Sequence, residues 1–443
     1  AAAMRAYGNE FQLLIDAQTA HHQEINSDLY VSTTGDDAND GLSPATALKT
    51  IKTAVYRVAS DSLNQKTVHV LPGVYSRSFN QQVFPIPLKS WIKVQGAGID
   101  ATQIVGEMDP AYASVQYNAL KVFTSFYQTH ASLEDLSITT SGSNNSCAIW
   151  GFEEESLNLK SLRMHDLSPD LFAVINISRA SNIRWDSITI EDFTTDSMGF
   201  MYSDGYITGS IRNSIFRNAS STFTSDEVWA NPLVWIVTRG EISFENCHFD
   251  NIEMMDDDSN IMTIGYSSTS PYNNRYKLIN CLFSNLQSHS RMMIMASPGY
   301  PEMDIANCTF SGNTSDTYIL MVNGNIRITN SVFYNNSPHE IAINPMPDSG
   351  ETSTITIDYS LYRGGYSGIQ QAPGNTIYYL DSNIDTNPLF TGGDDIHNSL
   401  FYSLSEFSPC INSGTPDTLG LFLPPYDLAG NWRIWNNRID MGC

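Results

Sequence analysis

The chain has 443 residues, 41% of them hydrophobic and 11% aromatic, which is ample for a large core. Its 23 basic and 47 acidic residues give a formal net charge of −24, which argues against binding to nucleic acid or anionic lipid. Six cysteines without any C-x-x-C spacing give no sign of a zinc ribbon or a thioredoxin-type site. No apolar run approaches the roughly 18 residues of a membrane-spanning helix.

Residues 1–65 are predicted to form a capping segment that contains a helix. The stretch "SPATALKTIKTAVYRVASDSLNQ" places five apolar residues on one helical face: Ala47, Ile51, Ala54, Val55 and Val58. Its opening Ser-Pro pair is a typical helix start. Such a cap would shield the open edge of the first true strand, which is predicted at "TVHVLPGVYS".

One turn of this segment offers oxygen ligands. In "GDDANDG", Asp36, Asp37 and Asp40 lie in a turn flanked by glycines, and carboxylate oxygens are the ligands that Ca²⁺ prefers. The twelve-residue spacing of an EF-hand is absent, since its terminal Glu is missing. The turn is therefore either a structural loop or a calcium site, and calcium is the one cofactor that the sequence suggests.

Residues 66–380 are built from a repeat. "ISFENCHFDNI" (242–252) recurs as "YKLINCLFSNL" (276–286) and "MDIANCTFSGN" (303–313). The polar residue before the Cys position occurs at intervals of 26 residues at Asp135, Ser161, Ser187 and Asn213, and again at Asn246, Asn280, Asn307, Asn330 and Tyr359. Apolar and polar residues alternate within each short run, which indicates strands with one buried face. Because one coil cannot bury that face alone, the coils must stack into a solenoid of parallel strands.

Three columns of this alignment carry structural predictions. Asn213, Asn246, Asn280, Asn307 and Asn330 are predicted to form an internal ladder at a turn, with their amides bonded to one another. The column of Cys247, Cys281 and Cys308 indicates core packing at a tight corner, although neighbouring coils lie within disulfide range. His248 follows with outward parity and is predicted to lie at the surface.

A column of alternating charge runs through Glu134, Lys160, Asp186, Arg212 and Glu245. On stacked parallel strands this pattern predicts cross-strand ion pairs, each worth about 0.2–1 kcal/mol. A groove that binds sugar hydroxyls is the alternative interpretation.

Residues 381–443 leave the repeat. They are rich in Pro, Gly, Asn and aromatic residues, as expected of an irregular C-terminal cap. Cys410 and Cys443 lie near the two edges of this segment and could form a disulfide.

The two ends resemble a known family. "LYVSTTGDDANDGLSPATALKTIKTAV" with "VHVLPGVYS" is similar to the N-terminal part of right-handed parallel β-helix proteins of the pectin-lyase-like superfamily. "SPCINSG" and "DLAGNWRIWNNRIDMG" resemble the C-terminal segment of bacterial surface β-helix proteins with an exchangeable anchor. The resemblance implies an all-β, single-stranded right-handed parallel β-helix, secretion or a bacterial cell-surface location, and an anchor beyond the C-terminus. It implies no particular activity, since this fold hosts lyases, hydrolases, adhesins and scaffolds.

Catalytic constellations are sparse. A polyuronate lyase needs a base and a cation, for which Arg212 and Arg239 are the mid-chain candidates. The Gly-His-Gly turn expected of a polygalacturonase-type hydrolase does not occur. Asp256, Asp257 and Asp258 in "EMMDDDSN" could supply paired carboxylates, but three adjacent aspartates in an insertion are more typical of a solvated loop.

Exposed aromatic residues offer a different function, because sugars stack on rings. Trp229, Tyr266 and Tyr272 lie in or beside the longest coils and are the candidate platform. The sequence therefore favours an exported β-helix protein that binds a polysaccharide or surface glycan, or serves as a structural or adhesive surface component, without catalysis. The alternative is a polysaccharide lyase or glycoside hydrolase with its site in coils 212–291.

Overall fold

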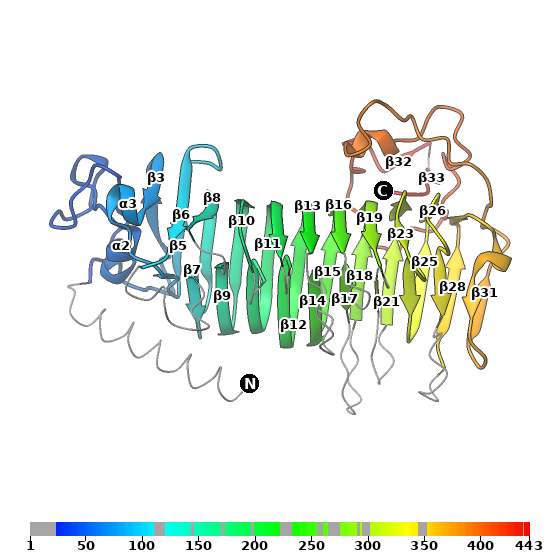
Figure 1. Ribbon diagram of the computed structural model, residues 1–443, viewed down its shortest axis with the longest axis horizontal. Helices are drawn as coiled ribbons and strands as arrows, with labels where there is room; N and C mark the ends of the chain where they lie inside the picture. Colours follow the sequence, from blue (N-terminus) through cyan, green and yellow to red (C-terminus); the bar gives the residue numbers. More distant parts are fainter. Residues whose placement is uncertain are drawn as a thin grey trace. The chain divides into compact units, whose positions relative to one another are not determined.

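The computed structural model describes residues 24–109, 120–142, 146–169, 173–195, 199–221, 233–254, 260–264, 275–289, 293–294, 302–343 and 352–443, with the exception of residue 437. The chain divides into two compact units, Ala1–Thr208 and Gly209–Cys443. Each unit contains a stack of β-coils whose strands pair in parallel with the equivalent strands of neighbouring coils (Figure 1), and the second unit also contains the separate two-stranded sheet of β32 (Ile434–Trp435) and β33 (Arg438–Ile439). Of the helices in the part of the chain that the structure describes, none has the length and apolar character needed to span a bilayer.

Short strands and few helices make up both units. The first contains β1 (Leu29–Val31), η1 (Pro44–Thr46), α2 (Ile51–Arg57), β2 (Lys66–Val70), β3 (Gly73–Ser76), α3 (Arg77–Asn80), β4 (Ile86–Pro87), β5 (Ile92–Gln95), β6 (Thr102–Glu107), β7 (Leu120–Phe126), β8 (Ala131–Ser141), β9 (Ser146–Glu154), β10 (Leu157–His165) and β11 (Ile175–Thr195). β12 (Met201–Arg212) spans the boundary between the units. The second unit continues with β13 (Ile215–Ser221), β14 (Val234–Arg239), β15 (Glu241–Glu245), β16 (His248–Met254), β17 (Met262–Ile264), β18 (Arg275–Ile279), β19 (Leu282–Ser288), β20 (Met293–Ile294), β21 (Glu302–Ala306), β22 (Thr309–Ser311), β23 (Thr314–Ser315), β24 (Leu320–Val322), β25 (Asn325–Thr329), β26 (Val332–Tyr334), β27 (Ile341–Ile343), β28 (Thr354–Asp358), β29 (Leu361–Tyr362), η3 (Tyr366–Gly368), β30 (Gln370–Gln371), β31 (Thr376–Tyr379), η4 (Ser399–Tyr402), β32 (Ile434–Trp435) and β33 (Arg438–Ile439).

The register of the coils is set by the predicted apolar columns. In the first unit, Leu159 of β10 lies opposite Leu133 of β8 and Trp185 of β11, and all three are buried. In the second unit, four consecutive phenylalanines stack face to face with ring centroids 4.5–4.9 Å apart: Phe249, Phe283, Phe310 and Phe333. Identical residues at one position of each coil thus build a continuous core. The predicted all-β parallel β-helix is confirmed.

The N-terminal helix is shorter than predicted. Ser43 caps only the single 3-10 turn η1, with its side chain accepting from the backbone N–H of Thr46. The chain then extends so that Leu48 bridges to Val31, and the helix α2 begins afterwards with Thr50 as its cap. Ala47 therefore lies in an extended segment between η1 and α2, and not in the helix. Ile51, Ala54 and Val55 form the buried face of α2 as predicted.

The asparagine column lies at the turns between strands, in a left-handed backbone conformation with φ near +50°. Asn246 Nδ2 donates to Asn213 Oδ1 at 2.9 Å, and Asn280 Nδ2 donates to Asn246 Oδ1 at 2.7 Å. The column is not buried along its whole length, because Asn213 is exposed and Asn246 is half-buried. Asn280, Asn307 and Asn330 are buried beneath the C-terminal segment instead.

The cysteines are packing residues. Cys247, Cys281 and Cys308 are fully buried, and each thiol donates to a backbone carbonyl of its own or a preceding coil. All six cysteines carry free thiols, including Cys410 and Cys443, so the bridges considered from the sequence do not form. Core packing of the column is therefore confirmed.

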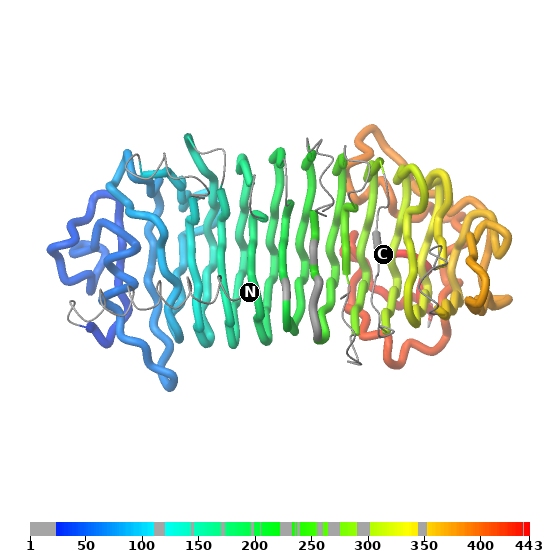
Figure 2. The backbone as a smooth tube through the Cα atoms, turned by 60° about the horizontal axis from the view of Figure 1, so that its bottom comes forward, coloured from blue at the N-terminus to red at the C-terminus, as the bar shows by residue number. Residues whose placement is uncertain are grey.

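The C-terminal segment, residues 389–443, folds back along the side of the second unit. Figure 2 shows this orange-to-red segment beside the green and yellow coils. Asn285 Nδ2 of β19 donates to the carbonyl of Ile396, and Asn307 Nδ2 donates to the carbonyls of Asp440 and Gly442. The segment has little regular structure of its own, so its place is fixed by such side-chain contacts with the coils.

Candidate functional site

Several of the catalytic and carbohydrate-binding residues predicted from the sequence lie in parts of the chain that the structure does not describe. Trp229, Tyr266, Tyr272 and Asp256, Asp257 and Asp258 lie outside the described residues. The backbone of Arg239 ends β14, and its side chain is likewise outside the description.

Arg212 takes part in the charge column. Its Nε lies 3.0 Å from Glu245 Oε2 on the neighbouring coil, and the Arg212 side chain is 53% exposed while that of Glu245 is 23% exposed. A surface pair of this kind contributes about 0–1 kcal/mol. The Arg212 guanidinium thus forms an ion pair between neighbouring coils, as the interpretation of the charge column as cross-strand ion pairs predicted.

The aspartates of the "GDDANDG" turn cap the backbone around them. Asp37 Oδ1 accepts from the backbone N–H groups of Lys49 and Thr50, and its Oδ2 accepts from the hydroxyls of Thr50 and Thr53. Asp36 and Asp40 each accept from the N–H two residues ahead. Within the described residues no group of three His, Cys, Asp or Glu side chains is placed to hold a metal ion. The calcium hypothesis gains no support from this turn.

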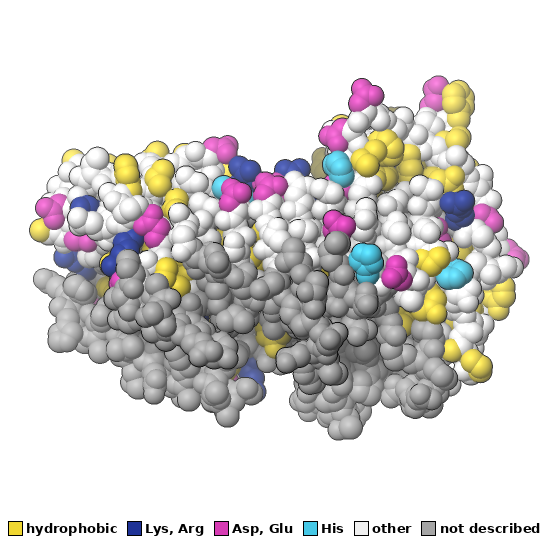
Figure 3. Space-filling model, in the orientation of Figure 1, with side chains coloured by type: hydrophobic (Ala, Val, Ile, Leu, Met, Phe, Trp, Pro, Cys, Tyr) yellow, Lys and Arg dark blue, Asp and Glu magenta, His cyan; other side chains and the backbone are white. Residues whose placement is uncertain are grey.

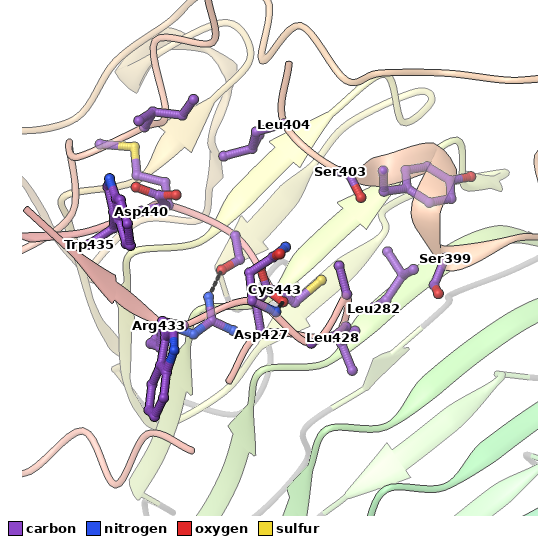
Figure 4. A pocket seen from close by; sticks show the side chains of 18 residues that line it. Leu282, Ser399, Ser403, Leu404, Asp427, Leu428, Arg433, Trp435, Asp440 and Cys443 are labelled. Atoms are coloured by element: carbon purple, nitrogen blue, oxygen red, sulfur yellow. Dashed lines mark hydrogen bonds between the residues drawn. The ribbon is translucent and has the colours of Figure 1, made fainter. Parts of the chain in front are cut away.

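A pocket of about 510 Å³ lies between the C-terminal segment and the outer surface of the coils. Leu282, at the start of β19, contributes the wall on the coil side. The remaining walls come from η4 with Ser403 and Leu404, from Ile411, from the turn 427–431, from Trp432, Arg433 and Trp435, and from the last residues, 440–443 (Figure 4). A cavity of this size accommodates a small-molecule ligand or one to two sugar rings.

Two tryptophans stand at this pocket with most of their surface in solvent. Trp432 is 62% exposed and Trp435 is 66% exposed. Trp432 is held by a bridge to Tyr426, whose ring lies 4.7 Å away. Trp435 is held by the antiparallel pairing of β32 with β33. Exposed hydrophobic side chains also gather over the surrounding lobe (Figure 3), which includes Phe407, Leu419, Phe422 and Ile434.

Between the tryptophans, the Arg433 side chain turns inward and is only 6% exposed. Its Nη1 donates to the carbonyl of Gly442 at 2.9 Å. Nε and Nη2 are buried and have no hydrogen-bond partner among the described residues. Burial lowers the pKa of Arg433, with smaller opposing effects from the Cys443, Asp427 and Asp440 side chains. The guanidinium remains charged at any physiological pH because its ordinary pKa is above 12.

Two carboxylates also line the pocket. Asp427 accepts from the backbone and side-chain nitrogens of Asn431, which closes the turn 427–431. Asp440 accepts from the backbone N–H of Asn412 at 2.6 Å, and burial raises its pKa. Neither carboxylate forms an ion pair with Arg433 in the part of the chain that the structure describes. The lining of the pocket therefore combines flat aromatic rings with a hydrogen-bond donor, Arg433, and hydrogen-bond acceptors, Asp427 and Asp440.

A polar network adjoins the pocket through Tyr402, which lines it. Asp250 is fully buried; its Oδ1 accepts from Ser284 Oγ and Asn285 Nδ2, both at 2.7 Å, and its Oδ2 lies 2.9 Å from His397 Nδ1. Burial raises the pKa of Tyr402, whose hydroxyl interacts with Asn285 and Ser284. The network fastens residues 396–402, and thus one wall of the pocket, to the coils.

His248 belongs to this network, and its predicted surface position is wrong. Its parity is outward, as expected, but the C-terminal segment covers it and leaves only 8% exposed. Nε2 lies 3.0 Å from Ser284 Oγ. Because Ser284 gives its one proton to Asp250, the hydroxyl oxygen accepts from His248, which fixes the proton on Nε2. Burial lowers the pKa of His248 to about 4.

Comparison with known proteins finds solved structures whose fold is similar to that of this chain. No family model and no curated protein sequence matches the chain. Pectate lyase Pel9A is 13% identical, covering 95% of this chain and 96% of its own, with a TM-score of 0.47. The catalytic domain of a GH87 α-1,3-glucanase in complex with nigerose is 12% identical over 81% and 69%, with a TM-score of 0.40. The GH136 lacto-N-biosidase from Eubacterium ramulus is 11% identical over 83% and 70%, with a TM-score of 0.37. At such values the likeness assigns neither ligand nor activity to this chain.

The pocket was not predicted from the sequence, although one signal was present. In "NWRIWNN", Arg433 is flanked by two tryptophans and an isoleucine, and the three apolar side chains are exposed while the charged one is buried. This reverses the usual preference of these residue types. The inversion becomes visible only once burial is known, because the segment has no period from which inward and outward positions can be derived.

Proposed function

We propose that this protein is an exported β-helix protein that binds carbohydrate in the pocket formed by its C-terminal segment. The observation that carries the proposal is the pair of exposed rings, Trp432 and Trp435, at a cavity lined by Arg433, Asp427 and Asp440. Flat rings bind the C–H faces of sugars, and charged or amide groups bind their hydroxyls. Each group of the pocket thus has a counterpart on a saccharide.

The rigidity of the site supports binding. Trp432 and Trp435 are held by strand pairing, and the segment that carries them is fastened to the coils by Asp250 and Asn307. Preorganised side chains lose little conformational entropy when a ligand arrives. Binding without rearrangement is the expected behaviour of such a pocket.

The non-catalytic interpretation is part of the proposal. The lyase or hydrolase alternative depends on Asp256, Asp257, Asp258 and Arg239, whose side chains lie outside the described residues, and on Arg212, which is paired with Glu245. A secreted or cell-surface location, with a surface anchor, also belongs to the proposal, as it follows from the sequence resemblance alone.

The test is a glycan-array screen of the intact chain, with Ca²⁺ and with chelator, followed by titration of the best ligand. Trp432→Ala and Trp435→Ala should each weaken binding about tenfold or more, because stacking on a ring contributes roughly 1–2 kcal/mol. Phe407→Ala is the matched control, since Phe407 is exposed on the same segment and does not line the pocket. Binding that survives both tryptophan substitutions would refute the pocket as the site.

The same pools should be assayed for new reducing ends and for unsaturated products. Binding without products supports a non-catalytic role. Products would make the protein an enzyme and would direct attention to the coils between residues 212 and 291.

A further inference from the structure

The last coil of the second unit ends in two strands with a free edge. β30 pairs with β27 and β31 pairs with β28, and neither β30 nor β31 has a second partner strand in the part of the chain that the structure describes. Figures 1 and 2 both place β31 at the end of the stack, while residues 389–443 lie along its side. A solenoid exposes its core and its strand edges at an uncovered end, so this coil is a candidate interaction surface.

The backbone of β31 has hydrogen-bonding groups on this edge that the pairing with β28 does not use. The N–H groups of Thr376 and Leu380 donate to backbone carbonyls on the β28 side, at 3.0 and 3.1 Å. Successive residues of a strand direct their backbone groups to opposite sides, so the N–H and C=O groups of Ile377 and Tyr379 point away from β28. A row of such groups on an edge strand is a template for pairing with another strand.

The side chains of β31 are less buried than those of the preceding coil. Ile377 and Tyr379 lie opposite Ile355 and Ile357 of β28, both of which are fully buried in the core. Ile377 and Tyr379 share that inward face, yet each is only half-buried, because no further strand covers them. Tyr378, on the outward face, is 54% exposed. The open end of the core thus suits a partner that brings its own apolar side chains.

The distribution of charge indicates which partner fits. Residues 373–380 include no charged side chain, in a chain whose net charge is −24. Edge strands are commonly protected against pairing by lysines or inward-pointing charges, and β31 has neither. Two copies of so acidic a chain repel each other over most of their surface. The uncharged end is a place where two copies can meet without bringing like charges into contact.

We propose that two copies of this chain associate end to end, with their β31 strands paired antiparallel about a two-fold axis at Tyr378. In this register Ile377 lies opposite Tyr379 of the second copy, and each such pair exchanges both of its backbone hydrogen bonds. Tyr378 lies opposite its own counterpart, where side chains approach most closely. Asp381 falls opposite Asn375 of the second copy, so no like charges meet along the strand. The joint covers both open ends of the core, and it does not depend on the proposed carbohydrate binding.

The first experiment measures the unaltered chain in solution. Sedimentation equilibrium from micromolar to near-millimolar concentration should show a reversible dimer with twice the mass of the chain. Hydrogen exchange gives a second measurement, because the amides of Ile377 and Tyr379 should exchange more slowly at high than at low concentration. A monomer at every concentration, or an open-ended series of larger assemblies, would overturn the proposal. Exchange at these two amides that does not change with concentration would overturn it as well.

The second experiment places charge on the two-fold axis. Tyr378→Lys and Tyr378→Glu each bring like charges face to face in the dimer, and each should weaken dimerisation about tenfold or more. An equal mixture of the two variants should associate again as a mixed dimer, because opposite charges then meet across the axis. Recovery on mixing is specific to a joint in which position 378 faces itself.

Tyr206→Lys is the matched control, because Tyr206 is 50% exposed and lies on a different strand, β12. It should leave the dimer unchanged. Dimerisation that tolerates both Tyr378 variants, or a loss that mixing does not reverse, would overturn the proposed joint. Circular dichroism establishes that each variant is folded. Should either Tyr378 variant not fold, the concentration dependence of mass and exchange in the unaltered chain decides alone.

Discussion

Asp250 and His397 are 147 positions apart in the sequence, and their side chains meet at 2.9 Å. Asp250 belongs to a coil strand and is fully buried, whereas His397 belongs to the C-terminal segment and is partly exposed. The pair joins the repetitive and the non-repetitive parts of the second unit. The pocket depends on this junction, because its walls come from both parts.

Removal of the Asp250 carboxylate should loosen the C-terminal segment. Asp250→Ala leaves Ser284, Asn285 and His397 without their acceptor, and we expect a loss of about 2–4 kcal/mol in the free energy of unfolding. His397→Ala should cost less, about 1 kcal/mol, because His397 is partly solvated. Urea unfolding and limited proteolysis of residues 389–443 measure the two effects.

Glu253→Ala provides the control for these variants, since Glu253 is an exposed residue of the same strand. Its stability should stay within about 0.5 kcal/mol of the unaltered protein. Equal protease resistance of Asp250→Ala and the unaltered protein would show that the segment is held in some other way.

Asn307 should contribute more to stability than Asn246. Both occupy the same column, but Asn307 is fully buried and donates to the carbonyls of Asp440 and Gly442. Asn307→Leu strands these two carbonyls and should cost about 2–3 kcal/mol. Asn246→Leu, at a half-buried position, should cost about 1 kcal/mol or less. Thermal melts of the two variants test the order, and a reversed order would contradict it.

Glu154 should make stability depend on pH. Burial raises the pKa of Glu154 to about 8, while an unfolded glutamate has a pKa near 4.5. Between about pH 4.5 and 8 the folded protein holds a proton that the unfolded chain releases. The stability contributed by this group therefore falls as pH rises through that window.

Glu154→Gln should remove this dependence, because the amide stays neutral and its oxygen can still accept from Ser125, as Glu154 Oε2 does. Relative to the unaltered protein, the variant should gain on the order of 3 kcal/mol between pH 5 and pH 8. Urea unfolding at the two pH values measures the difference. A stability difference that does not change with pH would show that Glu154 titrates normally.

His248 should produce the opposite dependence. Its pKa is about 4 in the folded protein and 6.5 in the unfolded chain. The unfolded chain thus binds a proton between those values, so the stability contributed by His248 is lost as pH falls from about 6.5 to 4. His248→Gln, which can still donate to Ser284, should reduce the acid-induced loss by on the order of 2–3 kcal/mol. Identical pH profiles for variant and unaltered protein would contradict a buried neutral histidine.

The architecture could be predicted from the sequence because, in a solenoid, residues that contact one another recur at a regular spacing along the chain. Residues that stack in space, such as Phe249 and Phe283, occupy the same place in successive repeats, and alternation within each run separates inside from outside. The buried cysteine column and the pairing of Arg212 with Glu245 follow from the same rule. These features need no knowledge of long-range contacts beyond the neighbouring coil.

The candidate site was decided by tertiary structure. Whether an outward residue is exposed depends on what covers it, and His248 and Asp250 are covered by a segment that begins more than a hundred residues later. That segment has no period, and single side-chain contacts such as Asp250 with His397 and Asn307 with Gly442 hold it in place. Such single contacts do not recur at a regular spacing and cannot be recognised in the sequence. The burial of Arg433 and the exposure of Trp432 and Trp435 are therefore determined only when the C-terminal segment packs against the coils.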